Sequence, residues 1–145
     1  MQISSRFTIA IHVLTAIDVF SDEYKVTSEL LASSVRTNPV VIRRILQQLK
    51  AAGLIETTRG RGGSFLKRDP SQITLLDIYR AVDCVESGDL FRFHDKPNEL
   101  CPVGRNIHTV MDGKLLKMQT ALEDEMKKTT LANILAETKQ LIAKA

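Results

Sequence analysis

The chain has 145 residues, of which 43% are hydrophobic and 26% are charged, and its formal net charge is +3. That length suits one domain with its own core, and the composition excludes a disordered or fibrous protein. The sequence lacks both an apolar run of the roughly 20 residues that span a bilayer and a signal-peptide cleavage region, so we expect a cytoplasmic protein without membrane contact.

The chain has few cysteine and histidine side chains, which often act as catalysts or metal ligands. The two cysteines, Cys84 and Cys101, are too few for a disulfide framework. In a reducing compartment we expect them to be free thiols, a redox pair or ligands. The three histidines, His12, His94 and His108, lack a partnering motif, so we do not predict an enzyme.

The start of the chain predicts a helix that ends near Phe20. Ser4 or Ser5 can cap it, and its apolar residues recur at the spacing of one buried face. These residues are Phe7, Ala10, Ile11, Leu14 and Ile17. Arg6 lies in the first turn, where the helix dipole disfavours a cation unless a phosphate is close. A phosphate contact and an ordinary surface position are both open for Arg6.

The next two predicted helices are separated by a three-residue turn. Thr27 caps a short helix, and residues 36–38 form the turn. Asn38 followed by Pro39 is a strong start signal, because asparagine is a preferred cap and proline suits the first helical position. Helix, short turn and helix together predict a helix-turn-helix.

The third predicted helix has two distinct faces. Its core spacing is carried by Ile42, Ile45, Leu46 and Leu49. The opposite face carries Val40, Arg43, Arg44 and Gln47. Arginine can bond guanine twice, glutamine can do the same to adenine, and an apolar side chain can touch a thymine methyl. A solvated amphipathic face is the alternative interpretation.

A short hairpin with a cationic tip follows this helix. Gly53 ends the helix, and residues 54–57 and 64–67 predict two strands joined by a glycine-rich turn. Arg59 and Arg61 at the tip can reach phosphates or a narrow minor groove. Residues 36–68 hold eight Lys and Arg residues but a single acid, Glu56. This concentration of charge favours a polyanionic partner at one face of the molecule.

The rest of the chain predicts three more helices. Thr74 and Asp77 form a capping box for a fourth helix, and residues 85–100 predict an ordered functional loop. A long helix from Pro102 to about Lys127 follows, and Thr130 opens a last one. The apolar stripe of the long helix is Val103, Ile107, Met111, Leu115, Met118 and Leu122. So small a domain cannot cover a helix of that length, so we expect it to pack against a second subunit.

The chain resembles the Rrf-two family of bacterial winged-helix transcriptional regulators, the group that includes IscR, NsrR and CymR. The resemblance lies in residues 38–82, NPVVIRRILQQLKAAGLIETTRGRGGSFLKRDPSQITLLDIYRAV. The family motif is a recognition helix ending in Leu-x-x-x-Gly-Leu, an Arg-Gly-x-Gly-Gly wing and an Ile-Thr-Leu helix start. The resemblance implies a mainly α fold with a winged helix-turn-helix domain, a small two-stranded wing and a long C-terminal dimerisation helix. It also implies a homodimer on a palindromic operator in double-stranded DNA.

The region before the long helix departs from the iron–sulfur members of that family. Those members carry three closely spaced cysteines there, whereas this chain keeps Cys101 beside Pro102. The spacing of Cys84, His94 and Cys101 fits neither a cluster nor a zinc knuckle. We therefore expect no cofactor, and the chain resembles a cluster-free subgroup best.

Two hypotheses for sensing follow from this region. Cys101 at a helix N-terminus near Arg105 should ionise easily, which favours a thiol switch that an oxidant operates. The alternative for Cys101 is a small apolar residue at a helix start. The second hypothesis is a pocket for a small-molecule effector, enclosed by Phe91, Phe93, His94 and the long helix.

The sequence thus predicts a DNA-binding transcriptional regulator that acts as a repressor. The predicted DNA-binding residues are Ser5, Arg6, Thr27, Arg36, Asn38, Pro39, Val40, Arg43, Arg44, Gln47, Arg59 and Arg61. We predict a DNA-binding domain over residues 1–84, a sensor loop over 85–101 with Cys84 at its edge, and a helical dimerisation region over 102–145. The alternatives are a winged-helix protein–protein interaction module and an iron–sulfur-dependent regulator.

Overall fold

Helices form most of the computed structural model, which describes residues 3–58, 62–82 and 90–145. The first three are α1 (Arg6–Phe20), α2 (Ser28–Val35) and α3 (Pro39–Ala51). They are followed by β1 (Ile55–Thr57), β2 (Ser64–Leu66), a short 3-10 helix η1 (Pro70–Gln72) and α4 (Leu75–Ala81). The last two helices are α5 (Pro102–Lys127) and α6 (Leu131–Lys144). This order confirms the predicted mainly α fold, with a helix-turn-helix, a two-stranded wing and a long C-terminal helix.

The predicted start signals of the helix-turn-helix work as expected. The Thr27 hydroxyl oxygen accepts a hydrogen bond from the backbone N–H of Leu30 at 3.1 Å, and Asn38 Oδ1 accepts one from the N–H of Val40 at 2.9 Å. Each bond satisfies a backbone donor that the first turn leaves free. The capping box predicted before α4 is also present. These local bonds fix where α2, α3 and α4 begin.

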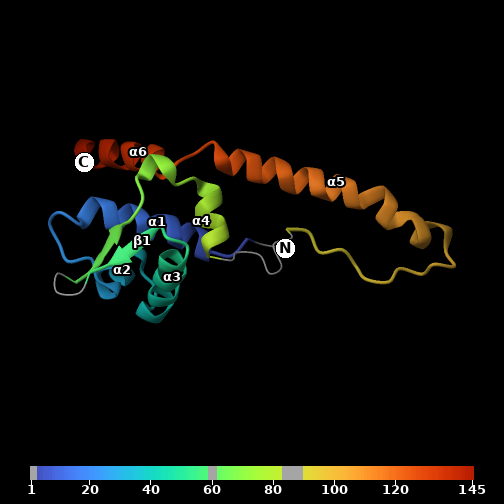
Figure 1. Ribbon diagram of the computed structural model, residues 1–145, viewed down its shortest axis with the longest axis horizontal. Helices are drawn as coiled ribbons and strands as arrows, with labels where there is room; N and C mark the ends of the chain where they lie inside the picture. Colours follow the sequence, from blue (N-terminus) through green and yellow to red (C-terminus); the bar gives the residue numbers. More distant parts are fainter. Residues whose placement is uncertain (1–2, 59–61, 83–89) are drawn as a thin grey trace.

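The hydrophobic core surrounds α1, which α6 covers on one side while α2 and α3 lie on the other (Figure 1). Its fully buried large side chains are Leu14, Ile17, Leu31, Ile42, Ile45, Leu49, Leu54, Ile55, Ile73, Ile78, Leu131 and Val13. Within α1, Val13 and Ala16 are buried, whereas Phe7 and Ile11 are only half-buried. The predicted single buried face of α1 was therefore wrong in part, because helices pack against more than one of its faces.

The last helix returns to the body at a point just after the wing. The backbone N–H of Leu131 donates to the carbonyl of Ile73 at 2.8 Å, and that of Leu75 donates to Thr129 at 3.0 Å. Leu131 and Leu135 are buried in the core. The predicted apolar face does not continue to the end of α6, since Leu141 and Ile142 are exposed.

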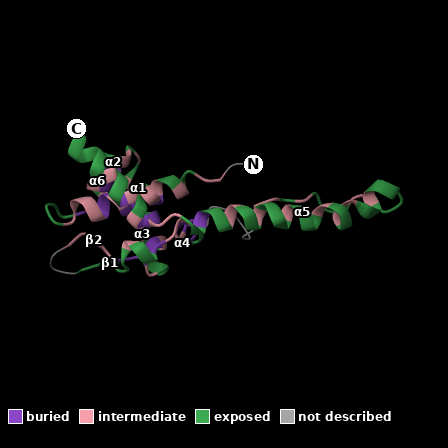
Figure 2. Cartoon of the chain, turned by 90° about the horizontal axis from the view of Figure 1, so that it is seen from above, coloured by how far each residue is buried: buried purple, intermediate pink, exposed green. Residues whose placement is uncertain are grey.

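The long helix α5 projects from the body, and residues 90–101 run alongside it (Figure 1). Met126, next to the body, is the buried residue of α5, and most of the helix is exposed or half-buried (Figure 2). Two members of the predicted stripe, Val103 and Met118, are 69% and 48% exposed. The other four, Ile107, Met111, Leu115 and Leu122, are half-buried. None of the described helices combines the length and apolarity needed to cross a membrane.

Candidate nucleic-acid interface

The four predicted base-reading side chains lie on one exposed face of α3. Ile42, Ile45 and Leu49 have no exposed surface and fix the opposite face in the core. The outward face carries Val40, Arg43, Arg44 and Gln47, all exposed. Val40 is 63% exposed, which the core does not explain, and a valine there can contact a thymine methyl. The structure thus brings these four residues together as predicted.

An ion pair that the sequence did not predict joins this face to α2. Arg43 Nη2 donates to Glu29 Oε1 at 3.0 Å. In the part of the chain that the structure describes, the neighbouring Arg44 forms no ion pair. The two arginines, which look alike in sequence, therefore differ in their surroundings.

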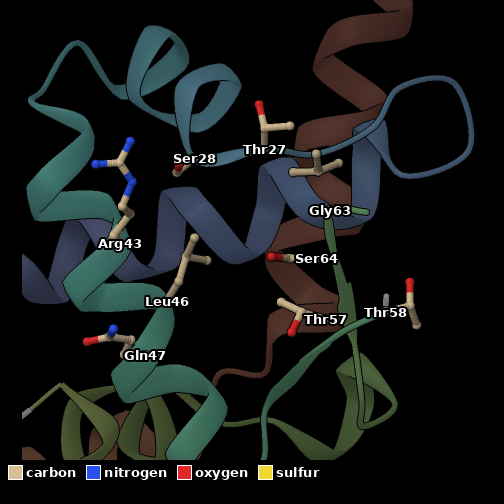
Figure 3. Close-up of a pocket in the computed structure, with 10 residues that line it drawn as sticks. Thr27, Ser28, Arg43, Leu46, Gln47, Thr57, Thr58, Gly63 and Ser64 are labelled. Carbon is tan, nitrogen blue, oxygen red and sulfur yellow. The ribbon is translucent and has the colours of Figure 1, made fainter. Parts of the chain in front are cut away.

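A hollow of about 370 Å³ separates α3 from the wing. Arg43, Leu46 and Gln47 line it from α3, while Thr57 and Thr58 lie on the strand side (Figure 3). Leu46, which was predicted to be a core residue, is only half-buried because it faces this hollow. The hollow therefore opens beside the outward face of α3.

The wing is tied to the segment before α2 through a glycine. Strands β1 and β2 pair antiparallel, with Ile55 opposite Leu66. The backbone N–H of Ser64 donates to the Val26 carbonyl at 3.1 Å. Gly63 has φ +84°, and a Cβ there would lie 2.9 Å from Val26 N, so this position requires glycine. Gly63 is therefore a structural part of the hairpin, next to the bond that anchors the wing to Val26.

The predicted phosphate-binding residues are divided between α1 and the helix-turn-helix. Thr27, Asn38 and Pro39 form the two helix starts, while Arg36 ends α2 in the left-handed conformation with φ 62°. The cap oxygens of Thr27 and Asn38 accept backbone hydrogen bonds, so these residues orient the helix N-termini that favour anions.

Of the two serines predicted to cap α1, Ser4 makes the bond to the first turn. Ser5 precedes the helix but its side chain makes no cap, whereas Ser4 Oγ accepts from the backbone N–H of Arg6 at 3.2 Å. Arg6 Nε also donates to Ser4 Oγ at 3.3 Å. Arg59 and Arg61, the predicted wing-tip cations, lie outside the described residues.

Aromatic rings hold the described part of the predicted sensor loop against α5. The Phe93 ring lies 4.8 Å from the His94 ring and 4.0 Å from the His108 ring, measured between centroids. His108 Nδ1 lies 3.1 Å from Asp112 Oδ1 on the next turn of α5. The sequence predicted that His94 belongs to this site. That His108 and Asp112 also lie there could be seen only once the loop was found to fold back on α5.

A hollow of about 230 Å³ lies beside this aromatic cluster. It is lined by Phe91, Phe93, Asp112, Leu115, Leu116 and Gln119. The Gln119 Oε1 atom accepts a hydrogen bond from the backbone N–H of Leu90 at 3.0 Å. Both phenylalanines are thus placed as predicted, while His94 stacks on Phe93 and does not line the hollow.

Cys101 occupies a tightly built turn at the start of α5. Its side chain is exposed, and the backbone N–H groups of Gly104 and then Val103 lower the pKa of its thiol below the ordinary value. Its own N–H donates to the Asn98 carbonyl at 3.2 Å. A Cβ at Gly104 would clash with that same Asn98 oxygen. Cys84 lies outside the described residues, so nothing places it near Cys101.

This combination of helix-turn-helix, anchored wing and basic, exposed recognition face defines a DNA-binding winged-helix protein. The family described as Rrf2, iron-dependent transcriptional regulator, matches residues 3–137. The chain belongs to this family, and it is a transcriptional regulator.

Individual relatives agree with that assignment. YwnA of Bacillus subtilis (strain 168), named as an HTH-type transcriptional regulator, is 42% identical over 134 residues, which cover 92% of this chain and 97% of YwnA. A crystal structure of a protein named as DNA-binding is 37% identical, with a TM-score of 0.71, covering 90% of this chain and 99% of the other. T. potens IscR shares the fold at 20% identity, with a TM-score of 0.71, covering 97% of this chain and 90% of IscR.

The donors in the described part of the chain do not fit a resident iron centre. Iron–sulfur clusters take most of their ligands from thiolates, and this chain has two cysteines, Cys84 and Cys101. Across residues 3–58, 62–82 and 90–145, no group of three or more His, Cys, Asp or Glu side chains is arranged to hold a metal ion.

Proposed function

We propose that this regulator is a homodimeric repressor that binds a palindromic operator through α3 and the wing. The observation that carries the proposal is the outward face of α3, where two arginines, a glutamine and a 63% exposed valine stand together above a fixed core face. Side chains that can hydrogen-bond base edges, next to an exposed apolar side chain, suit the major groove. A purely solvated face does not require an exposed apolar side chain such as Val40.

Two such helices enter successive major grooves about 34 Å apart when a dimer binds. Arg43, Arg44, Gln47 and Val40 then meet base edges. The N-termini of α2 and α3, with Ser5, Arg6 and Arg36, approach the phosphates. Arg59 and Arg61 extend from the wing to the backbone or the minor groove.

The length of α5 that projects from the body supports the proposal of a second subunit. Its 26 residues span about 39 Å. Three large apolar side chains on one side of it are exposed: Val103, Val110 and Met118. Monomeric proteins rarely leave such a series open to water. A second copy of α5 would cover the stripe and set the distance between the two recognition helices.

We propose that release from DNA is controlled where the loop meets the distal end of α5. Cys101 is exposed, its thiol has a lowered pKa, and its turn is closely packed at Gly104. Its thiolate attacks a peroxide oxygen, an S–O bond forms as the O–O bond breaks, and hydroxide leaves. The sulfur loses two electrons to the peroxide. The resulting polar sulfenic acid disturbs the packing of the turn against α5.

The hollow beside Phe93 supports the alternative signal, a small-molecule effector. Its two phenylalanines and two leucines suit an apolar body, and Asp112 and Gln119 supply polar partners. Ligand binding there would change how the loop is held on α5. Cys101→Ser separates the two signals, because it removes a response to peroxide and leaves a response to an effector.

One experiment tests the proposed function. DNA fragments that bind the purified full-length protein are sequenced after selection from a genomic library, with and without peroxide, for the wild type and for Cys101→Ser. We expect an enriched inverted repeat that peroxide depletes only for the wild type. Without an enriched motif, and with salt-insensitive binding, DNA reading would be refuted. An unchanged peroxide response in Cys101→Ser would refute the thiol switch alone.

A further inference from the structure

The ion pair between α2 and α3 stands on the surface that faces DNA in the proposed complex. Arg43 Nη2 contacts Glu29 Oε1 at 3.0 Å, and Ser28 Oγ donates to the other carboxylate oxygen, Oε2, at 3.1 Å. Both oxygens of Glu29 are therefore held. Ser28 and Arg43 also line the hollow between α3 and the wing (Figure 3).

Folding stability does not account for this pair. The side chains of Arg43 and Glu29 are 55% and 66% exposed, and exposed ion pairs contribute little to stability. A carboxylate on a surface that approaches phosphates also opposes DNA binding through charge repulsion. Glu29 also lies in the first turn of α2, where an acid favours the helix, but that role does not require its contact with Arg43.

We infer that Glu29 is a specificity-determining residue of the DNA interface, one that makes Arg43 a reader of guanine and prevents it from serving as a general phosphate contact. The inference rests on the proposed function of α3. It needs no new binding site, because the ion pair is already formed in the free protein.

The chemistry of the two possible targets differs in charge. The major-groove edge of guanine offers the neutral acceptors N7 and O6. A guanidinium has five N–H donors, of which Glu29 engages one, so Arg43 can bond guanine without leaving Glu29. A phosphate approaching Arg43 is an anion and meets the charge of Glu29 at the same place. The carboxylate therefore weakens the binding of a phosphate to Arg43 and leaves the binding of guanine unchanged.

The charge of Glu29 is secured locally. Its pKa lies below the ordinary value because of a backbone hydrogen bond, and then of hydrogen bonds from Arg43 and Ser28. The neighbouring Arg44 provides the internal contrast, since within the described residues no acid pairs with it. Arg44 is free to bond either a base or a phosphate.

The test compares Glu29→Gln with Glu125→Gln in the full-length protein. Glu125 pairs with Lys128 at 3.0 Å, and both side chains are about as exposed as the Glu29 pair, at 71% and 70%. Each substitution removes one negative charge and one surface ion pair, but only Glu29 lies beside the recognition helix. Thermal unfolding midpoints of both variants verify that the fold is kept.

The probes are the duplex that the wild type selects from a random pool and a scrambled duplex of the same composition. We expect Glu29→Gln to bind the scrambled duplex about tenfold more tightly at 0.1 M salt, with the salt slope steeper by about 0.9, because Arg43 becomes free to contact one more phosphate. Binding to the selected duplex should change less than about threefold. The ratio of the two affinities therefore falls, whereas Glu125→Gln keeps it.

Arg43→Ala and the double variant separate the inference from the proposed function. If Arg43→Ala leaves discrimination between the duplexes intact, the proposed reading face and the inference both fail. If Arg43→Ala loses discrimination while Glu29→Gln behaves like Glu125→Gln, the reading face stands and the inference fails. The inference also fails if Glu29→Gln has its full effect in an Arg43→Ala background.

Discussion

The N-terminal body and the projecting helix α5 differ in how they bury their apolar side chains. In the body, α1 is enclosed by α2, α3 and α6, and the large core side chains have almost no exposed surface. In α5, Met126 is the buried residue, whereas Val103, Val110 and Met118 are exposed and the other stripe residues are only half-buried. The body buries its core within one chain, whereas α5 leaves apolar side chains exposed that the proposed dimer would cover. This difference suggests that DNA reading and subunit pairing can be disturbed separately.

The largest expected effect comes from the core of the body. Leu49→Ala removes a side chain with no exposed surface from the inner face of α3, so we expect the free energy of unfolding to fall by roughly 3–5 kcal/mol. Urea denaturation followed by circular dichroism measures the change. The matched control is Val40→Ala on the outer face of α3, which should alter stability by less than about 0.5 kcal/mol while weakening DNA binding. Equal destabilisation by both would contradict the two-faced description of α3.

The next effect should appear in α5 and leave the body intact. Met118→Glu places a charge in the proposed dimer contact, and we expect the dissociation constant of the dimer to rise at least a hundredfold, or about 3 kcal/mol. Sedimentation equilibrium measures it. Thr120→Glu adds the same charge two residues further along the helix, away from Met118, and should leave the dimer unchanged. A monomeric wild type would refute the proposal that α5 forms a dimer contact.

A smaller effect should distinguish two glycines, one from each region. Gly63→Ala meets both a positive φ of +84° and a 2.9 Å approach to Val26 N, so it should destabilise the wing by about 1–2 kcal/mol. Gly113→Ala in α5 meets nothing within 4 Å, and it should stabilise its helix by about 0.5–1 kcal/mol. Thermal unfolding of each variant, supported by hydrogen exchange at the wing, provides the measurement. Wild-type wing protection in Gly63→Ala would show that the contact with Val26 is dispensable.

The smallest effect concerns the pH dependence of Cys101. The neighbouring N–H groups lower the pKa of its thiol, so the thiolate is formed at lower pH than in a free cysteine. The rate of reaction with peroxide should rise with pH and level off below the pH at which a cysteine-containing peptide levels off. A thiol-reactive reporter followed from pH 5 to 10 measures both curves, with Cys101→Ser correcting for Cys84. Identical curves would mean that the turn does not activate the thiol.

Features of the fold that depend on neighbouring residues were predictable from the sequence. Asn38 followed by Pro39 marked the start of α3, and the capping box at Thr74 marked α4, because both signals act within one helical turn. The outward face of α3 followed from helical periodicity alone. For the same reason the exposure of Val40 beside Arg43 was predictable.

Features that depend on distant residues were not predictable in this way. The position of α6 on α1 depends on where the chain returns after α5, so the burial of Ala16 did not follow from the pattern of α1 itself. The Glu29–Arg43 pair joins residues from two helices and requires their crossing to be known. The contact of His108 with Phe93 likewise requires the loop to lie along α5. The predicted boundary at residue 102 remains a functional proposal, since the core shared by α1 and α6 crosses it.

The hydrogen bonds between residues 73–75 and 129–131 have a mechanical consequence. They attach the end of α5 to the segment between η1 and α4, so any tilt of α5 about this junction is amplified along its length. With an arm of about 39 Å, a tilt of about 5° displaces the distal end by about 3 Å. In the proposed complex, a movement of that size at Cys101 would accompany a rotation of the body by only about 5°.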